Sequence, residues 1–170
     1  RVLFRSPDNV DLPNIPEGHL NDLPPSAERL RRMFGFDGNW TDDEIKRARA
    51  AYFGLVSFLD DKIGHLMDTL EEQGLAENTV IIHTSDHGDM LGEHGMWRKM
   101  SFYEQSARVP LQISWPGKFD GGQRIGEAVS NVDAVATILD LAGIDLSKWN
   151  LDGQSLVTAL NGDTSELNDV

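Results

Sequence analysis

The chain contains no cysteine and few basic residues, and these shortages exclude several classes of protein. Without cysteine, the 170 residues form neither a disulfide nor a thiolate metal site. Lysine and arginine total 15 against 28 aspartates and glutamates, so the formal net charge is −13 at pH 7. Nucleic-acid binding requires a basic surface, and this balance argues against it. No apolar run reaches the roughly 20 residues of a membrane-spanning helix, so we expect no membrane partner.

Several catalytic motifs are also missing. The sequence has no His-Glu-x-x-His of a zinc protease, no Gly-x-Ser-x-Gly of a serine hydrolase and no Gly-x-x-x-x-Gly-Lys-Ser/Thr phosphate loop. The acids around Asp86 lack the alternate spacing of an EF-hand. The hydrophobic content of 39% and the length of 170 residues fit one globular domain that can bury a core.

The stretch 84–95 carries the strongest chemical signal. The apolar run Val80-Ile81-Ile82 predicts a buried strand, and Asp86 and His87 follow shortly after it. Open α/β sheets bind ligands beyond the carboxyl ends of their strands. A carboxylate and a neutral imidazole both bind divalent metals. We therefore expect Asp86 and His87 to form about half of a metal shell.

The remaining pattern predicts an α/β fold with a layered sheet flanked by helices. Thr41 to Glu44 form a capping box, which predicts a long helix ending near Gln73 before Gly74. The apolar residues of this helix recur at helical spacing: Ile45, Ala48, Tyr52, Leu55, Val56, Leu59, Ile63, Leu66, Met67 and Leu70. The other expected elements are a short helix at 27–33, strands at 79–84 and 111–114, a helix capped by Asn131 that runs to about Leu141 and ends at Gly143, and a short helix at 155–160.

The segment from Asn78 to Leu111 resembles the sulfatase family of the alkaline phosphatase superfamily. Three features occur in the order and spacing of that family: Asn78-Thr79-Val80-Ile81-Ile82-His83-Thr84-Ser85-Asp86-His87-Gly88, then Leu91-Gly92-Glu93-His94-Gly95-Met96-Trp97-Arg98-Lys99, then Ser106-Ala107-Arg108-Val109-Pro110-Leu111. Similarity in the flanking helices extends the resemblance from about Thr41 to Leu160. Within the family, the sequence is most similar to choline-sulfatase-like members.

This resemblance implies an alkaline-phosphatase-like fold and roles for three residues. Asp86 and His87 match metal ligands of the family, which implies a divalent cation. Oxygen ligands favour Ca²⁺, and the imidazole leaves Mn²⁺ and zinc open. Lys99 matches a lysine that contacts the sulfate oxygens, and its charge would stabilise the transition state. The alternatives from the residues alone are an aspartate that caps a turn, a hydrogen-bonded histidine and a solvated surface lysine.

The family's nucleophile is missing from the sequence. It is a formylglycine made from the first residue of a Cys/Ser-x-Pro-x-Arg motif, and no proline here has an arginine two positions later. We therefore interpret residues 7–170 as the C-terminal part of a sulfatase catalytic domain, truncated at the N-terminus. Residues 1–6, Arg-Val-Leu-Phe-Arg-Ser, match a translated sequencing-adapter end and are predicted to be non-native.

His94 and Trp97 are candidate substrate-binding residues. The imidazole of His94 could bond a leaving-group oxygen or a metal ligand, and Trp97 could offer its ring to a quaternary ammonium group such as choline. A loop histidine and a packed tryptophan are equally open. Glu93 and Asp89 are expected to be solvated or to bond the loop, rather than to bind metal.

The leading hypothesis is a fragment of a sulfuric ester hydrolase that cleaves small sulfate monoesters, with choline sulfate as the preferred substrate. The fragment itself is expected to be inactive. The alternatives are a phosphonate or phosphate monoester hydrolase of the same superfamily, and a non-catalytic binding module. A homo-oligomer of the intact enzyme is compatible with the sequence, and the compartment is open between cytoplasm and periplasm.

Overall fold

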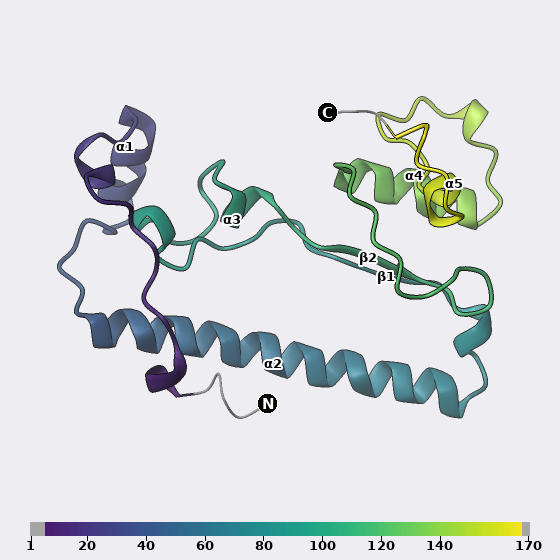
Figure 1. The fold of residues 1–170 in the computed structure, drawn as a ribbon, viewed down its shortest axis with the longest axis horizontal. Coiled ribbons are helices and arrows are strands. Elements are labelled where there is room, and N and C mark those ends of the chain that lie inside the picture. Colours follow the sequence, from purple (N-terminus) through teal and green to yellow (C-terminus); the bar gives the residue numbers. More distant parts are fainter. Residues whose placement is uncertain (1–5, 168–170) are drawn as a thin grey trace. The chain divides into compact units, whose positions relative to one another are not determined.

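The computed structural model describes residues 6–167, which fall into two compact units. One unit comprises the described part of Arg1–Leu70 with His87–Val109, and the other comprises Glu71–Asp86 with the described part of Pro110–Val170. Of the start predicted to be non-native, residues 1–5 lie outside the described part. The α-helices and strands are α1 (Pro25–Met33), α2 (Asp42–Glu72), β1 (Ile81–Thr84), α3 (Glu104–Ala107), β2 (Leu111–Ser114), α4 (Asn131–Leu141) and α5 (Val157–Leu160), and Figure 1 shows them along the chain.

Helix α2 begins and ends as the sequence predicts. The backbone N–H of Thr41 donates to Glu44 Oε2 at 2.8 Å, and the N–H of Glu44 donates to Thr41 Oγ1 at 3.3 Å. These two bonds complete the capping box. The bond from the Thr41 N–H is the main reason why the pKa of Glu44 lies below its usual value. At the other end, Gly74 has a φ of +67° and donates to Glu71 O, so it ends the helix as expected.

The apolar stripe of α2 is less buried than its spacing suggests. Only Arg49 and Ala50 are buried on this helix. Leu55, Leu59 and Leu66 are 67%, 53% and 55% exposed. Periodicity identifies the face that would pack, but it does not show whether a covering element is present.

The first unit contains five of the buried apolar residues. Met90 and Met96 are fully buried, and Val10, Ala27 and Ala50 are buried with them in this unit. Met90 and Met96 belong to the connection between β1 and β2, which also carries the predicted site residues. The connection is therefore packed against its own unit and is not a free surface loop.

The second unit contains a two-stranded antiparallel sheet. Strands β1 and β2 pair from Ile81 opposite Ser114 to Thr84 opposite Leu111, and they lie side by side in Figure 1. The predicted strand at 79–84 thus begins at Ile81. The apolar run at its start is half-buried, so the prediction of a buried strand is wrong. In a two-stranded sheet each strand is an edge strand, and its partner can protect only one side.

Helix α4 has a different N-cap from the predicted one. Ser130 is the N-cap, and its N–H donates to Asp133 Oδ2 at 2.7 Å in a capping box. Asn131 is the first helical residue, and its side chain is used elsewhere, as described below. At the C-terminus Gly143, with a φ of +75°, donates to Asp140 O and ends the helix as predicted.

A buried polar cluster joins α4 to the segment before α5. The hydroxyl of Thr137, fully buried, donates to Asp133 O at 2.7 Å and accepts from the N–H of Leu156 at 2.9 Å. Asp133 Oδ1 accepts from the N–H of Gln154 at 2.9 Å. Every polar atom in these bonds has a partner, so the cluster can be buried without a large desolvation penalty.

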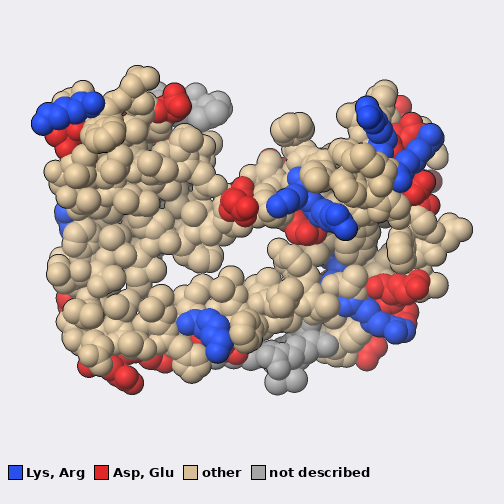
Figure 2. All heavy atoms as spheres, turned by 180° about the vertical axis from the view of Figure 1, so that it is seen from behind, with Lys and Arg blue, Asp and Glu red and all other residues tan. Residues whose placement is uncertain are grey.

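The described surface has no dominant basic patch on the face drawn in Figure 2. Lysine and arginine side chains on that face lie beside aspartates and glutamates. The ion pairs between described residues three or four positions apart include Arg32–Glu28, Arg47–Asp43, Arg108–Glu104 and Lys148–Asp145. Among residues 6–167, no helix is both long enough and apolar enough to cross a membrane.

Candidate metal and sulfate site

The connection from β1 to β2 carries all the predicted site residues, and its first residues are anchored. Asn131 Nδ2 donates to Ser85 O at 2.8 Å, and Thr84 Oγ1 donates to Asn131 Oδ1 at 2.9 Å. Both bonds lie within the second unit. They fix the backbone immediately before Asp86. The polar side chain that the sequence placed at a helix cap therefore holds the end of β1.

After Asp86 the chain forms a closed loop within the first unit. The N–H of Met90 donates to Arg98 O and the N–H of Gly92 donates to Met96 O, each at 2.8 Å. These bonds pair the outgoing limb of the loop with its returning limb. The loop thereby brings His87 and Lys99, which are twelve residues apart, to its open end.

His87 and Lys99 are in direct contact. Lys99 Nζ lies 2.5 Å from His87 Nε2, and His87 Nδ1 lies 2.8 Å from Gly88 O. A carbonyl oxygen only accepts and an ammonium only donates. The Gly88 contact therefore needs the proton on Nδ1 and the Lys99 contact needs the lone pair on Nε2, and together they select one neutral tautomer. His87 thus presents its lone pair to a cation, which in this structure is the Lys99 ammonium.

This arrangement fits a histidine that binds metal. Such histidines usually donate their second ring N–H to a backbone carbonyl or a carboxylate, which fixes the tautomer and the ring orientation. His87 makes this bond to Gly88. Asp86 is exposed and directly precedes His87, so their Cα atoms are about 3.8 Å apart. Among the described residues, no three His, Cys, Asp or Glu side chains gather into a metal-binding group, so Asp86 and His87 would form only part of a shell.

The loop is unusually rich in left-handed backbone. Leu91, His94 and Arg98 have φ values of +47°, +54° and +63°, although none is glycine. A left-handed conformation costs about 1 kcal/mol or more for such residues. Strain of this kind is often found at functional sites, where the surrounding structure holds it in place. The backbone of this loop is therefore consistent with a site that depends on a fixed geometry.

His94 lies in an aromatic cluster. Its ring stacks on Tyr103 with centroids 4.5 Å apart and an interplanar angle of 6°, and it meets the edge of His19 at 5.1 Å. His94 Nδ1 is buried and has no hydrogen-bond partner. The packing supports the alternative of a packed loop histidine, and a role in substrate binding remains a prediction.

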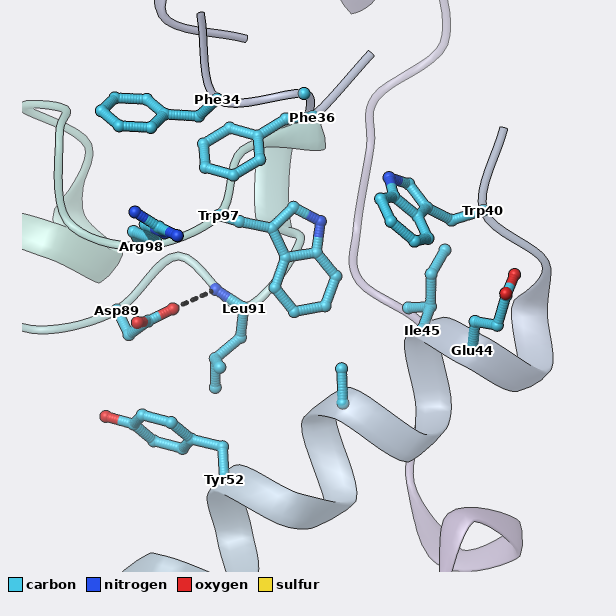
Figure 3. Close-up of a pocket in the computed structure, with 12 residues that line it drawn as sticks. Phe34, Phe36, Trp40, Glu44, Ile45, Tyr52, Asp89, Leu91, Trp97 and Arg98 are labelled. Carbon is cyan, nitrogen blue, oxygen red and sulfur yellow. Dashed lines mark hydrogen bonds between the residues drawn. The ribbon is translucent and has the colours of Figure 1, made fainter. Parts of the chain in front are cut away.

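Trp97 lines a cavity of about 430 Å³ in the first unit. Figure 3 shows Trp97 and Leu91 from the loop facing Ile45 and Tyr52 of α2, with further aromatic rings from the segment after α1. The lining includes Phe34, Phe36 and Trp40, the carboxylates of Glu44 and Asp89, and Arg98. Arg98 places its guanidinium over the Phe34 ring at 5.3 Å. The cavity thus already contains a cation–π contact within the chain, and the role of Trp97 in substrate binding remains a prediction.

Asp89 bonds the loop, as predicted, whereas Glu93 bonds segments outside it. Asp89 Oδ1 accepts from the N–H of Leu91 at 2.9 Å. Glu93 Oε1 pairs with Arg49 at 3.0 Å, and its Oε2 accepts from the N–H of Asn14 at 2.8 Å. Arg49, which is 8% exposed, was not among the predicted site residues. The only signal was a charged residue inside the apolar spacing of α2.

Known proteins match this chain over a segment that includes the candidate site. The family model named Sulfatase matches residues 17–144. The chain is 43% identical over 147 residues to a choline-sulfatase from Rhizobium meliloti (strain 1021), covering 84% of the chain and 28% of that protein. It is 42% identical over 120 residues to arylsulfatase K from Bos taurus, covering 71% of the chain and 22% of that protein.

Solved structures show the same relationship. The phosphonate monoester hydrolase from Silicibacter pomeroyi superposes with a TM-score of 0.78 at 30% identity, covering 94% of this chain and 33% of that one. The phosphonate monoester hydrolase of Agrobacterium radiobacter superposes with a TM-score of 0.70 at 32% identity, covering 77% and 26%. The predicted alkaline-phosphatase-like α/β fold is thereby confirmed. The chain spans between a fifth and a third of the length of these proteins.

Proposed function

Because the chain belongs to the sulfatase family, we propose that it forms part of a sulfuric ester hydrolase, in which Asp86 and His87 hold a divalent metal. The observation that carries this proposal is the tautomer of His87. Gly88 O requires a proton on Nδ1, and the Lys99 ammonium requires a lone pair on Nε2. When bound, the metal supplies Lewis-acid polarisation of the sulfate ester.

Lys99 takes the role of a cation for the sulfate group in this proposal. Its ammonium bonds His87 Nε2 in this structure, and a metal bound there would take that lone pair and leave the ammonium to the sulfate oxygens. Three N–H donors on one side chain can neutralise charge that develops on the sulfate and leaving-group oxygens. This local positive charge is needed because the substrate is anionic and the chain carries a net charge of −13. Residues 17–144 contain no Cys/Ser-x-Pro-x-Arg motif, so the formylglycine of the family is not among them.

The ligand atoms of the site support a particular metal ion, and the similarity to a named relative supports a particular substrate. Ca²⁺ is the proposed ion because hard carboxylate oxygens favour it, and the imidazole of His87 makes Mn²⁺ the alternative. Choline sulfate is the proposed substrate, supported by the similarity to a choline-sulfatase. In this assignment Trp97 presents its ring to the quaternary ammonium and His94 lies on the leaving-group side.

A chimeric enzyme tests the proposal. Residues 17–144 would replace the matching segment of the Rhizobium meliloti choline-sulfatase, and hydrolysis of choline sulfate would be measured. In an active chimera, Lys99→Ala should lower kcat/KM by roughly 10²- to 10³-fold, because a charge that stabilises the transition state is lost. Lys118→Ala is the matched control, since Lys118 is an exposed lysine that lies over Trp115 at 4.9 Å. Equal activities for the two variants, or a folded chimera with no activity, would refute the proposal.

A phosphonate monoester hydrolase is the second candidate. The two phosphonate monoester hydrolase structures support it, because they superpose well at 30% and 32% identity. The same segment can be placed in the Silicibacter pomeroyi enzyme, and both chimeras assayed with aryl sulfate and aryl phosphonate monoesters. Activity restored only in the phosphonate hydrolase would favour this candidate over the sulfatase.

A further inference from the structure

Ser106 lies at the point where the two limbs of the site loop meet α3. The residue is 3% exposed and is the only buried residue of this helix. Its Oγ donates to Lys99 O at 2.7 Å, and its backbone O accepts from the N–H of Gly88 at 2.8 Å. Ser106 is thus hydrogen-bonded both to the backbone of Lys99 and to the backbone of Gly88, the residue after His87.

The contact on the Gly88 side is too close for any other residue. A Cβ atom on Gly88 would lie 2.0 Å from Gln105 O and 3.5 Å from the Cα of Ser106. The backbone of the His87 limb therefore lies directly against α3. The neighbouring backbone pairs of the loop, Met90 with Arg98 and Gly92 with Met96, bond limb to limb. At Gly88 the partner is instead α3, so Ser106 takes over the pairing at the open end of the loop.

We propose that Ser106 is a positioning residue, which sets the separation between Lys99 and His87 by holding both limbs of the loop. Two bonds through one buried residue leave little freedom for either limb to move. Loss of the hydroxyl would release the Lys99 limb while the backbone bond to Gly88 remains. The benefit of this positioning for catalysis rests on the proposed function. The positioning itself can be tested without catalysis, because it concerns only the contact between Lys99 and His87.

The contact between Lys99 Nζ and His87 Nε2 can be measured by ¹⁵N NMR of the imidazole rings in the 170-residue chain. With the five histidines labelled with ¹⁵N, the Nε2 resonance of His87 in metal-free buffer reports whether an ammonium donates to it. Lys99→Met defines the value without the contact. We expect Ser106→Ala to move the resonance most of the way to that value. Ser101→Ala is the matched control, because Ser101 Oγ is also buried but has no hydrogen-bond partner, and we expect it to leave the resonance unchanged.

The amide resonances around Ala50 of α2, which is buried in the same unit as Ser106 but lies outside the loop, show that each variant remains folded. If Ser106→Ala does not fold, Ser106→Cys takes its place, since its thiol has a similar size and donates only weakly. A folded variant whose His87 resonance stays at the wild-type value would overturn the proposal and leave Ser106 a packing residue. A shift of the same size in Ser101→Ala would also overturn it. An inactive chimera would refute the proposed function but would not alter this result.

Discussion

Glu93 is the residue through which three separate segments of the first unit are bonded. Its carboxylate pairs with Arg49 of α2 and accepts from the backbone of Asn14, while its own backbone belongs to the site loop. The side chains of Arg49 and Glu93 are only 10% and 20% exposed. Arg49 also donates to Leu91 O at 2.6 Å, so the guanidinium holds the strained part of the loop against the long helix.

Glu93→Gln should therefore destabilise the first unit. The amide keeps the shape of the carboxylate but leaves the guanidinium of Arg49 buried without a counter-charge. Breaking such a pair costs about 3 kcal/mol. Glu104→Gln is the control, because the Glu104–Arg108 pair is 3.8 Å apart and largely exposed, and its loss should cost less than about 1 kcal/mol. Urea unfolding measures both values, and a similar cost for the two variants would contradict the prediction.

Single residues of the site were predictable only where their chemistry is local. The place of Asp86 and His87 shortly after β1 and the left-handed Gly74 after α2 follow from neighbouring residues. The bonds of Ser106 and Asn131 join residues distant in sequence, and spacing carries no information about them. Asn131 was expected to cap α4 because it precedes an apolar helix, but the adjacent Ser130 caps it with Asp133.

At the scale of elements, the ends of the helices followed the sequence closely. Caps are set by residues three or four positions apart, so local chemistry decides them. Helix α2 ends at Glu72, one residue before the predicted Gln73, and β2 has the predicted bounds. Burial was predicted less well. The apolar run before Asp86 is half-buried, because burial depends on layers that a strand's own residues do not specify.

The cap of α2 should make the helix sensitive to acid. The pKa of Glu44 is lowered, first by the backbone N–H of Thr41 and then by its hydroxyl. A carboxylate with a lower pKa in the folded state stabilises the helix above its unfolded pKa, and this stabilisation is lost as the pH falls through the folded pKa. Circular dichroism at 222 nm during acid titration should show helix loss in this range. In Thr41→Ala this step should be weaker, and an unchanged titration would count against the capping box.

For the whole molecule, the exposed apolar residues of α2 bear on how the chain behaves in solution. Leu59 and Leu66 are 53% and 55% exposed on the same helix. Contiguous apolar surface of this kind usually marks a place where other protein packs. The chain spans 28% of the related choline-sulfatase and 33% of the related phosphonate hydrolase, so much of the common fold is outside the compared segment.

Replacing these leucines should make the 170-residue chain less prone to associate. Leu59→Gln combined with Leu66→Gln removes apolar surface from water without emptying a core, so helicity should be retained. Binding of the dye 1-anilinonaphthalene-8-sulfonate and light scattering should both decrease. Ala50→Gln is the contrasting variant, because Ala50 is 5% exposed and the larger side chain should reduce helicity. Unchanged dye binding in the double variant would show that this surface is already covered.

The small number of gathered ligands limits metal binding by the chain. Calcium takes six to eight oxygen ligands, and strong sites depend on several carboxylates. Among the described residues no group of three acidic or imidazole ligands gathers, so Asp86 and His87 should bind Ca²⁺ or Mn²⁺ only with a Kd of roughly millimolar or weaker.

Titration with Mn²⁺ shows where on the chain the ion binds, because the paramagnetic ion broadens the NMR signals of nearby residues. The signals of His87 should broaden before those of His65, an exposed histidine on α2, and Asp86→Asn should weaken the effect. Equal broadening of the two histidines would mean that no site exists at Asp86 and His87, and calorimetric binding at micromolar Ca²⁺ would mean that the chain holds a complete shell.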